Sequence, residues 1–307
     1  MSDRASLLVA LAERLLLADG AMGTQLQRAG LPPGGCGEAW NVDYPERVLA
    51  IQSAYVAAGS DCLITNTFGA SRIMLERHGE GERVAEINEA GARVARAAFG
   101  GRAGFVLGDI GPFGGLMEPY GEITRAAVER AFREQARALV AGGVDAILVE
   151  TQTALEEIEL AIAAAREAGA PVVIGSFAFD KMLDYDEVRT MMGVSPERAA
   201  EFLAAEGADI AALNCGTGVD MRMAADVVRR YRATVDLPVM AQPNAGQPEL
   251  IQMQVVYRET PEEMVAGLPE LVAAGARIVG GCCGSTPDHI RRFREALDRL
   301  ARERTFA

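Results

Sequence analysis

The sequence predicts an α/β fold, a single (β/α)8 TIM barrel that forms one domain over residues 1–307. Three observations support this prediction. Eight short apolar, β-branched runs recur along the chain, amphipathic segments of helix formers separate them, and no change in composition marks a domain boundary. Eight is the number of parallel strands that closes such a barrel. A doubly wound open sheet is the alternative that the same alternation of strands and helices allows.

The eight predicted strands each end in glycine or polar residues. In chain order they are LLLADG from Leu15, CLITNTFG from Cys62, FVLGDIGP from Phe105, AILVETQ from Ala146, VVIGSF from Val172, IAALNCG from Ile210, PVMAQPNAG from Pro238 and IVGGCCG from Ile278. Between them, helices are predicted for PERVLAIQSAYVAAG from Pro45, TRAAVERAFREQARALVAGG from Thr124 and SPERAAEFLAAEG from Ser195. Ser195 is a helix N-cap followed by proline at the first helical position, and the glycines are placed where these helices stop.

The apolar run Leu7 to Ala12 precedes the first strand. Glu13 and Arg14 interrupt it soon afterwards, and it has no basic leader or cleavage site. We therefore expect a helix packed under one end of the barrel. Because no stretch approaches the roughly 20 apolar residues that span a bilayer, we expect a cytoplasmic protein without a membrane contact.

The formal net charge of the chain is -13 at pH 7, and the chain has no basic run. Nucleic acid and anionic membrane surfaces both bind clustered Lys and Arg, so neither is an expected partner. Small molecules are the expected partners, and the sequence is compatible with a homo-oligomer.

Polar residues gather where the predicted strands end. A barrel of this kind places the carboxyl ends of its strands on one face and builds its active site there. Because a buried strand has little use for polar side chains, we expect these to converge on one pocket. They are Asp19, Asn66, Asp109, Glu150, Asn214 with Cys215, Gln242 with Asn244, and Cys282 with Cys283.

The 5 cysteines are an odd number in a chain without a secretory signal, so we expect reduced thiols or metal ligands instead of a disulfide framework. Cys36 lies in a loop rich in proline and glycine, and Cys62 begins the second strand at the opposite end of the barrel. Neither is expected to have a chemical role, because free cysteine packs as a small hydrophobe. Cys215, Cys282 and Cys283 all fall at carboxyl ends, so these three can meet.

Cys282 and Cys283 are adjacent within GGCCG. Neighbouring residues of a regular strand point to opposite faces, so both can face one metal only if the backbone leaves extended geometry, which the flanking glycines permit. Three thiolates and one vacant position are typical of a catalytic tetrahedral zinc. A vicinal disulfide and a pair of packing cysteines are the alternatives. Neither histidine is expected as a fourth ligand, since His78 lies in a charged segment and His289 is expected to face solvent in the first turn of a helix.

A zinc ion with three thiolate ligands carries a net charge of -1, so it is a weak Lewis acid and a poor activator of water. Such a site suits a soft fourth ligand, such as a substrate thiol with a free pKa near ~8.5. This chemistry favours methyl or alkyl transfer to a thiol by direct displacement at carbon.

Motifs spread in order between about residues 15 and 297 carry a family resemblance. They are DGAMGTQLQ at Asp19, WNVDYPERV at Trp40, AGSDCLITNTFG at Ala58, VETQT at Val149, RTMMGV at Arg189, LNCGTG at Leu213, QPNAG at Gln242 and GGCCGSTPDHI at Gly280. Together they resemble the homocysteine S-methyltransferase family. That family comprises betaine-homocysteine and S-methylmethionine-homocysteine methyltransferases and the homocysteine module of cobalamin-dependent methionine synthase.

The resemblance implies a barrel whose catalytic zinc is held by Cys215, Cys282 and Cys283. It also implies that Asp19 and Glu150 hold the amino acid part of homocysteine. A cationic amino group buried near two carboxylates makes physical sense, because hydrogen bonds between charged groups are strong.

Four further residues are expected at the substrate site. The backbone N–H groups of Ala21 and Met22 are expected to face the carboxylate of homocysteine. Asn66 is expected to support the site by orienting loops. Trp40, the only tryptophan, occupies a position that resembles the aromatic residue of the betaine site, which favours a cationic donor.

The function that follows is zinc-dependent transfer of a methyl group from a small donor of the betaine or S-methylmethionine type to the thiol of homocysteine, giving methionine. One alternative is a methyltransferase subunit that exchanges methyl groups with a separate corrinoid protein. An alternative of a different class is a non-catalytic zinc or thiol barrel that senses redox state through Cys282 and Cys283.

Overall fold

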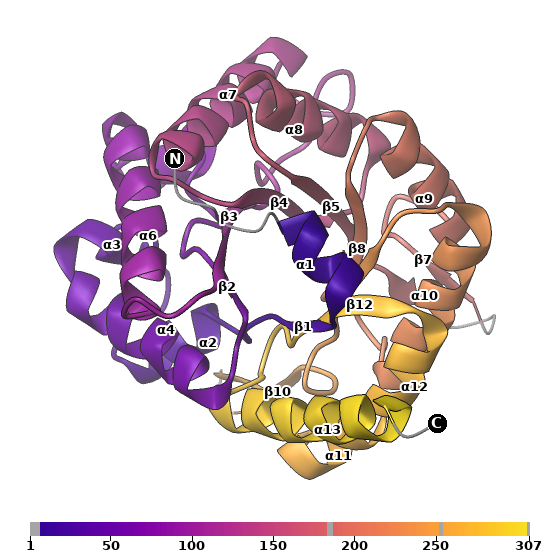
Figure 1. Ribbon diagram of the computed structural model, residues 1–307. Helices are drawn as coiled ribbons and strands as arrows, with labels where there is room; N and C mark the ends of the chain where they lie inside the picture. The colour runs from indigo at the N-terminus through magenta and orange to yellow at the C-terminus, as the bar shows by residue number, and fades with distance from the viewer. Residues whose placement is uncertain (1–6, 183–186, 252–253, 306–307) are drawn as a thin grey trace.

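The computed structural model describes residues 7–182, 187–251 and 254–305. Within these residues, eight parallel strands form a nearly closed barrel that helices surround (Figure 1). The barrel strands are β1 (Leu16–Leu17), β2 (Cys62–Ile64), β3 (Phe105–Ile110), β4 (Ala146–Gln152), β5 (Val173–Phe177), β8 (Ile210–Asn214), β9 (Val239–Gln242) and β12 (Ala276–Val279). Each predicted strand is present, and the (β/α)8 barrel is confirmed over the doubly wound sheet.

The helices occupy the segments between the strands. They are α1 (Leu7–Glu13), α2 (Gly23–Arg28), α3 (Trp40–Asp43), α4 (Pro45–Ala58), α5 (Arg72–Glu76), α6 (Val84–Ala98), α7 (Arg125–Ala141), α8 (Leu155–Glu167), α9 (Pro196–Ala205), α10 (Met221–Thr234), α11 (Pro261–Ala266), α12 (Leu268–Ala274) and α13 (Pro287–Thr305), with one 3-10 turn at Gly81–Arg83. Ser195 caps α9 as predicted, because its hydroxyl accepts a hydrogen bond from the Arg198 N–H at 3.4 Å. None of the described helices is long and apolar enough to cross a membrane.

The strand order shows how the barrel closes. From β1 the sheet runs through β12, β9, β8, β5, β4 and β3 to β2. Asp61 joins the two end strands: its N–H donates to the Leu17 carbonyl at 2.7 Å, and its Oδ2 accepts from the Leu17 N–H at 2.9 Å. Arg294 of α13 bonds the same carboxylate at 2.7 Å, so a helix also holds the seam.

Helix α1 lies across the amino-terminal end of the barrel (Figure 1), where the apolar run was predicted to pack. Leu7 and Leu11 are buried in one cluster with side chains that point inward from the strands, such as Leu16 and Ile278. Cys62 belongs to the same cluster and is fully buried. This end of the barrel is therefore filled with apolar side chains, and the polar residues that can form a site lie at the opposite end.

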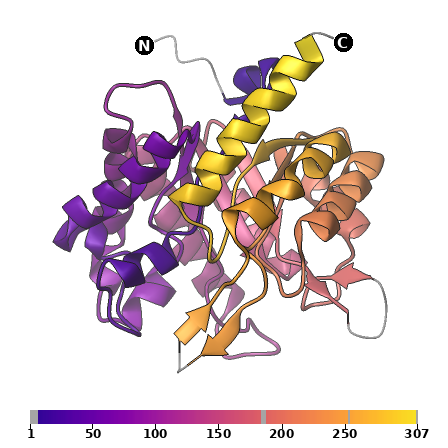
Figure 2. The ribbon, with the colours of Figure 1, turned by 90° about the horizontal axis from the view of Figure 1, so that it is seen from below.

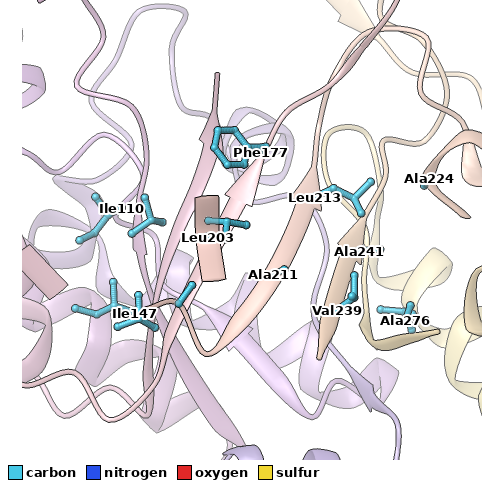
Figure 3. Packing of buried hydrophobic residues seen from close by; sticks show 14 of the residues in the cluster. Ile110, Ile147, Phe177, Leu203, Ala211, Leu213, Ala224, Val239, Ala241 and Ala276 are labelled. Atoms are coloured by element: carbon cyan, nitrogen blue, oxygen red, sulfur yellow. The ribbon is translucent and has the colours of Figure 1, made fainter. Parts of the chain in front are cut away.

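Alternation along each strand divides the core into two layers. On β4, Ile147 and Val149 face outward to the helices, whereas Ala146 and Leu148 face the barrel interior. Figure 3 shows part of the outer layer. A Cβ atom at Gly175 of β5 would lie 2.3 Å from Leu203 Cδ2, so the absence of a side chain there lets α9 pack directly on the sheet.

Two antiparallel hairpins extend from the carboxyl-terminal face of the barrel. One pairs β6 (Asp180–Lys181) with β7 (Val188–Arg189), and the other pairs β10 (Glu249–Ile251) with β11 (Gln254–Val256). Figure 2 shows both hairpins on the side of the molecule opposite to α1 and the end of α13. They belong to the rim around the strand ends.

Candidate active site

The inward-facing positions of the strands become polar at their carboxyl ends. On β4 the apolar Leu148 is followed two residues later by Glu150, and on β8 Ala212 is followed by Asn214. Because every second side chain of a strand points to the same face, each polar group faces the barrel interior, as the apolar residue two positions before it does. Glu150 lines a cavity of about 490 Å³ at the carboxyl-terminal face, and the Asn214 amide donates to its carboxylate at 3.2 Å.

Three cysteines meet at one side of this cavity. The Sγ atoms of Cys215, Cys282 and Cys283 all lie within 4.8 Å of one another, and those of Cys282 and Cys283 are 4.0 Å apart. All three side chains are half-buried and reduced. The strand ends of β8 and β12 thus bring together the residues that the sequence predicted to meet.

The backbone leaves extended geometry at Cys215 and also around the pair Cys282 and Cys283, where the glycines of GGCCG indicated it. Strand β12 ends at Val279, and Gly284 has a φ of +80°, a left-handed conformation that glycine adopts without strain. Cys215 has a φ of +58°, which is unusual for a residue with a side chain. The Cys282 N–H donates to the Pro243 carbonyl at 2.9 Å, which fixes the new direction of the chain.

The electrostatics of the cluster suit a soft cation. Hydrogen bonds from Cys215 and Cys282 lower the pKa of the Cys283 thiol to about 3, whereas the pKa of Cys282 is raised by its hydrogen bonds to the other two thiols. The lowered pKa favours the thiolate form of Cys283. Thiolate is the form of cysteine that binds metals, so the residues fit a metal such as zinc with three sulfur ligands.

One expectation about histidine was wrong. His289 is only 5% exposed instead of facing solvent. Its Nδ1 lies 3.2 Å from the Thr286 nitrogen, which donates to it, and its Nε2 lies 3.0 Å from the Glu259 carbonyl. The loop that carries Glu259 covers the first turn of α13, so His289 joins two rim segments and contributes no ligand. His78 is exposed.

Acidic side chains at three of the strand ends, Asp19, Asp109 and Glu150, line the same cavity. Burial raises the pKa values of Asp19, Asp109 and Glu150, that of Glu150 to about 8. Asp19 and Asp109 each have a buried Oδ1 atom without a hydrogen-bond partner among the described residues. No Lys, Arg or His occurs among the described residues that line the cavity. A cationic ligand group would supply the missing donors and offset the negative charge.

The two backbone N–H groups predicted to bind the homocysteine carboxylate differ in their hydrogen bonding. The Ala21 N–H already donates to Ser285 Oγ at 3.0 Å, so the expectation that it is free for a ligand is wrong. Within the described part of the chain, no group accepts a hydrogen bond from the Met22 N–H, and Met22 lines the cavity. Ser285 also donates to the Cys282 carbonyl at 2.7 Å and thereby joins the turn after β1 to the turn after β12.

Asn66 and Trp40 have different positions relative to the cavity. Asn66 lines it, but its amide donates to the Gly37 carbonyl at 2.8 Å, so the side chain supports the loop after α2. Trp40 does not line it: the residue begins α3, is 6% exposed and packs against Leu26. The Arg47 guanidinium covers its ring at 4.9 Å from the centroid. The prediction that Trp40 contacts a donor is therefore wrong.

Sequence reasoning missed three residues of the site. Asp109 was placed at a strand end but was given no role, and Ser285 and Tyr257 were not considered. Tyr257 follows β11 and lines the cavity together with Cys283. Burial and the neighbouring cysteine charges raise the pKa of this phenol. The VYRETP stretch alone gives no sign of this position, because it lies on a hairpin that is distant in sequence from Cys283.

Comparisons with known proteins agree with the resemblance. Residues 16–297 match the family model described as homocysteine S-methyltransferase. Methionine synthases of Mycobacterium tuberculosis and Mycobacterium leprae are 34% and 33% identical to the chain. These alignments cover 96% and 95% of the chain but 26% and 25% of the relatives, so the chain spans about a quarter of their length.

A solved structure shows the same fold. The metallated form of the homocysteine methyltransferase MmuM from Escherichia coli is similar with a TM-score of 0.75 and 23% identity, over 94% of this chain and 99% of that chain. Its oxidized form gives a TM-score of 0.74 at the same identity. From the motifs, the family match and the identity to the mycobacterial enzymes, we conclude that the chain belongs to the homocysteine S-methyltransferase family.

Proposed function

We propose that this protein transfers a methyl group to the thiol of homocysteine, giving methionine, with zinc held by Cys215, Cys282 and Cys283. One observation carries the proposal: a single cavity is lined by three thiols and by the acidic side chains of Asp19, Asp109 and Glu150. An amino acid with a terminal thiol presents the two complementary groups, a soft sulfur and an ammonium. When bound, zinc supplies a soft cation that lowers the pKa of a substrate thiol.

The side chains of this protein position the substrate. The carboxylates of Asp19 and Glu150 accept hydrogen bonds from the ammonium group, and the Met22 N–H donates to the substrate carboxylate. The homocysteine sulfur attacks the methyl carbon, so that an S–C bond forms while the N–C or S–C bond of the donor breaks. The electron pair leaves with the donor, which becomes neutral at that atom, and the thiol proton passes to solvent.

A small onium compound of the betaine or S-methylmethionine type is the donor we propose. A cavity lined by acids and without basic side chains among its described residues attracts a cation. Phe68 and Tyr257 are the aromatic residues that line it, and they replace Trp40 as candidates for contact with an onium group.

A separate corrinoid protein is the second candidate donor. Large apolar side chains are exposed on segments that follow the strand ends, including Leu116 (57%), Tyr120 (82%), Met191 (74%) and Leu250 (69%). Exposed apolar groups of this kind are typical of protein contacts. The identity to methionine synthases, of which this chain spans about a quarter, also favours a partner that brings the methyl group.

The first experiment measures zinc content and counts sulfur ligands by X-ray absorption, with and without homocysteine. Three sulfurs that increase to four on addition of homocysteine would support a thiol-activating site. Turnover is then measured with betaine, S-methylmethionine and methylcobalamin. Turnover with an onium donor alone excludes the need for a corrinoid protein. Protein that forms a reversible Cys282–Cys283 disulfide, releases zinc and turns over no donor would instead be a redox barrel.

A further inference from the structure

The side chain of Ser285 lies between the turn after β1 (residues 19–22) and the turn after β12. It is fully buried. The Ala21 N–H donates to Ser285 Oγ at 3.0 Å, and this oxygen lies 2.7 Å from the Cys282 carbonyl. Because the Ala21 N–H can only donate and the carbonyl can only accept, the hydroxyl proton goes to the Cys282 carbonyl. One hydroxyl thus links the turn after β1 to a residue of the cysteine cluster.

Two glycines leave the space that this hydroxyl occupies. A Cβ atom on Gly20 would lie 2.6 Å from Ser285 Oγ, and one on Gly281 would lie 2.5 Å from it. Nonbonded carbon and oxygen atoms do not approach so closely, so a side chain at either position would displace the hydroxyl. The Gly281 N–H also donates to the Asp19 carbonyl at 3.1 Å. The backbones of the two turns are therefore in direct contact, with the Ser285 hydroxyl between them.

Hydrogen bonds fix the peptide groups on both sides of Ala21. Ser285 accepts from the N–H of the peptide that joins Gly20 to Ala21. The Tyr55 hydroxyl donates to the Ala21 carbonyl, which belongs to the next peptide, at 2.7 Å. In a trans peptide the C=O and N–H point in opposite directions, so the Met22 N–H points away from Tyr55. This N–H is the group proposed to bind the homocysteine carboxylate, and its direction depends on how Ala21 is held.

We propose that Ser285 is a positioning residue that couples the turn after β1 to the metal ligand Cys282. The inference rests on the proposed function, because it assumes that the cysteine cluster binds a metal. Cys282 is restrained when the metal is bound, and the serine transmits this restraint to Ala21. The turn is then ordered before the amino acid arrives, and a site that is ordered in advance binds its ligand more tightly. Metal and amino acid therefore strengthen the binding of each other by the same factor.

The test measures the binding of 2-aminobutyrate by isothermal calorimetry to the zinc-free and the zinc-loaded protein. This amino acid is homocysteine with hydrogen in place of its thiol, so it occupies the amino acid part of the site without a sulfur bond to the metal. In the wild type we expect the zinc-loaded form to bind it about 5-fold more tightly. In Ser285→Ala we expect the ratio of the two dissociation constants to fall to about 1, since one neutral hydrogen bond corresponds to about a 5-fold change.

Ser71→Ala is the matched control. Ser71 is also buried, and its hydroxyl accepts from the Met74 N–H at 3.4 Å, but the residue does not line the cavity. This variant should keep the wild-type ratio. A Ser285→Ala protein that is less stable but keeps the wild-type ratio would show that the serine has only a structural role, and would overturn the inference.

Gly20→Ala tests the same link with the serine retained, in case Ser285→Ala does not fold. Its methyl group would displace the hydroxyl, so the ratio should again fall, whereas a direct effect of the methyl group on the ligand would change both constants alike. A wild-type ratio in this variant would overturn the inference. A wild-type protein that methylates homocysteine but has a ratio near 1, or does not bind 2-aminobutyrate, would overturn the inference and leave the proposed function intact. A wild-type protein that binds no zinc would overturn both.

Discussion

Asn214 and Thr151 hold each other by two hydrogen bonds between the ends of β8 and β4. The Thr151 N–H donates to Asn214 Oδ1 at 2.9 Å, and Asn214 Nδ2 donates to Thr151 Oγ1 at 2.7 Å. Thr151 and Cys215, the residue after Asn214, both have a φ of +58°. A left-handed conformation costs a residue with a side chain about 1–3 kcal/mol, and the surrounding bonds must supply it. One amide thus stabilises two bends, one beside Glu150 and one at Cys215, a ligand of the metal site that we propose.

Asn214→Ala should destabilise the protein and weaken metal binding together. The change removes bonds to Thr151 and to the Ser176 hydroxyl and leaves buried groups unpaired, so we expect the free energy of unfolding to fall by about 2–4 kcal/mol. Urea denaturation checks the stability, and chelator competition checks the zinc affinity. Asn88→Ala is the control, because Asn88 is equally buried but bonds the carbonyls of Ala70 and Val84 far from the cysteines. Equal zinc affinity in the two variants would contradict the role of Asn214.

Cys215→Ala should abolish stoichiometric zinc binding while the fold remains. The two thiols that remain in the turn after β12 cannot complete a tetrahedral site, and the half-buried position of Cys215 limits the cost to the core. Metal analysis after gel filtration and circular dichroism give the two measurements. Cys36→Ala is the matched control, since Cys36 is also half-buried but its thiol donates to Glu38 at 3.7 Å, away from the cluster. A Cys215→Ala protein with one equivalent of zinc would rule out this ligand set.

Asp19→Asn should lower kcat/KM for homocysteine and leave zinc content unchanged. Asparagine can still accept from the Ile64 N–H, as Asp19 Oδ2 does at 2.9 Å, but it loses the charge that we propose binds the ammonium. A lost charged hydrogen bond of about 1.5–3 kcal/mol corresponds to a decrease of about 10- to 100-fold. Steady-state kinetics with varied homocysteine measure it. Asp43→Asn changes a charge that pairs with Arg83 at the surface and should have no such effect.

The sequence predicted the barrel because alternation in strands such as AILVETQ is local information. The inward series Ala146, Leu148 and Glu150 follows directly from the period of two, whereas the meeting of Cys215 with Cys282 and Cys283 follows from their common place at the carboxyl ends of strands. The position of Trp40 was missed because α3 is a helix of 4 residues next to a loop with proline and glycine. Such a short helix has no periodic pattern from which its buried face could be predicted. Its burial depends on Leu26 and Arg47, which other segments supply.

Contacts between distant segments could not be predicted either. The pattern STPDHI indicates a helix start, but not that the Glu259 carbonyl, 30 residues away, covers His289. The DGAMG turn indicates free N–H groups, but Ser285 reaches the Ala21 N–H from 264 residues along the chain. Such contacts follow from how loops pack on the rim, and no local rule determines that packing.

Glu157 makes stability depend on pH. It is 8% exposed, its Oε1 accepts from the Phe113 N–H at 2.8 Å, and burial raises its pKa from 4.5 to about 7. The unfolded chain loses this proton near pH 4.5, whereas the folded protein keeps it to about pH 7. The contribution of the neutral carboxyl is therefore complete below pH 4.5 and is lost as the pH rises to 7.

Glu157→Gln should remove this pH dependence, because its amide oxygen can accept the same hydrogen bond without ionising. At 1.36 kcal/mol per pKa unit, the variant should be more stable than the wild type by up to about 3 kcal/mol at pH 8, and the two proteins should converge near pH 4. Urea denaturation across this range measures the difference. Glu156→Gln, at the exposed neighbouring position, should follow the wild-type curve. If the stability of Glu157→Gln changed with pH in parallel with that of the wild type, the carboxyl would be ionised in the folded protein. The Phe113 N–H and nearby solvent would then stabilise its buried charge.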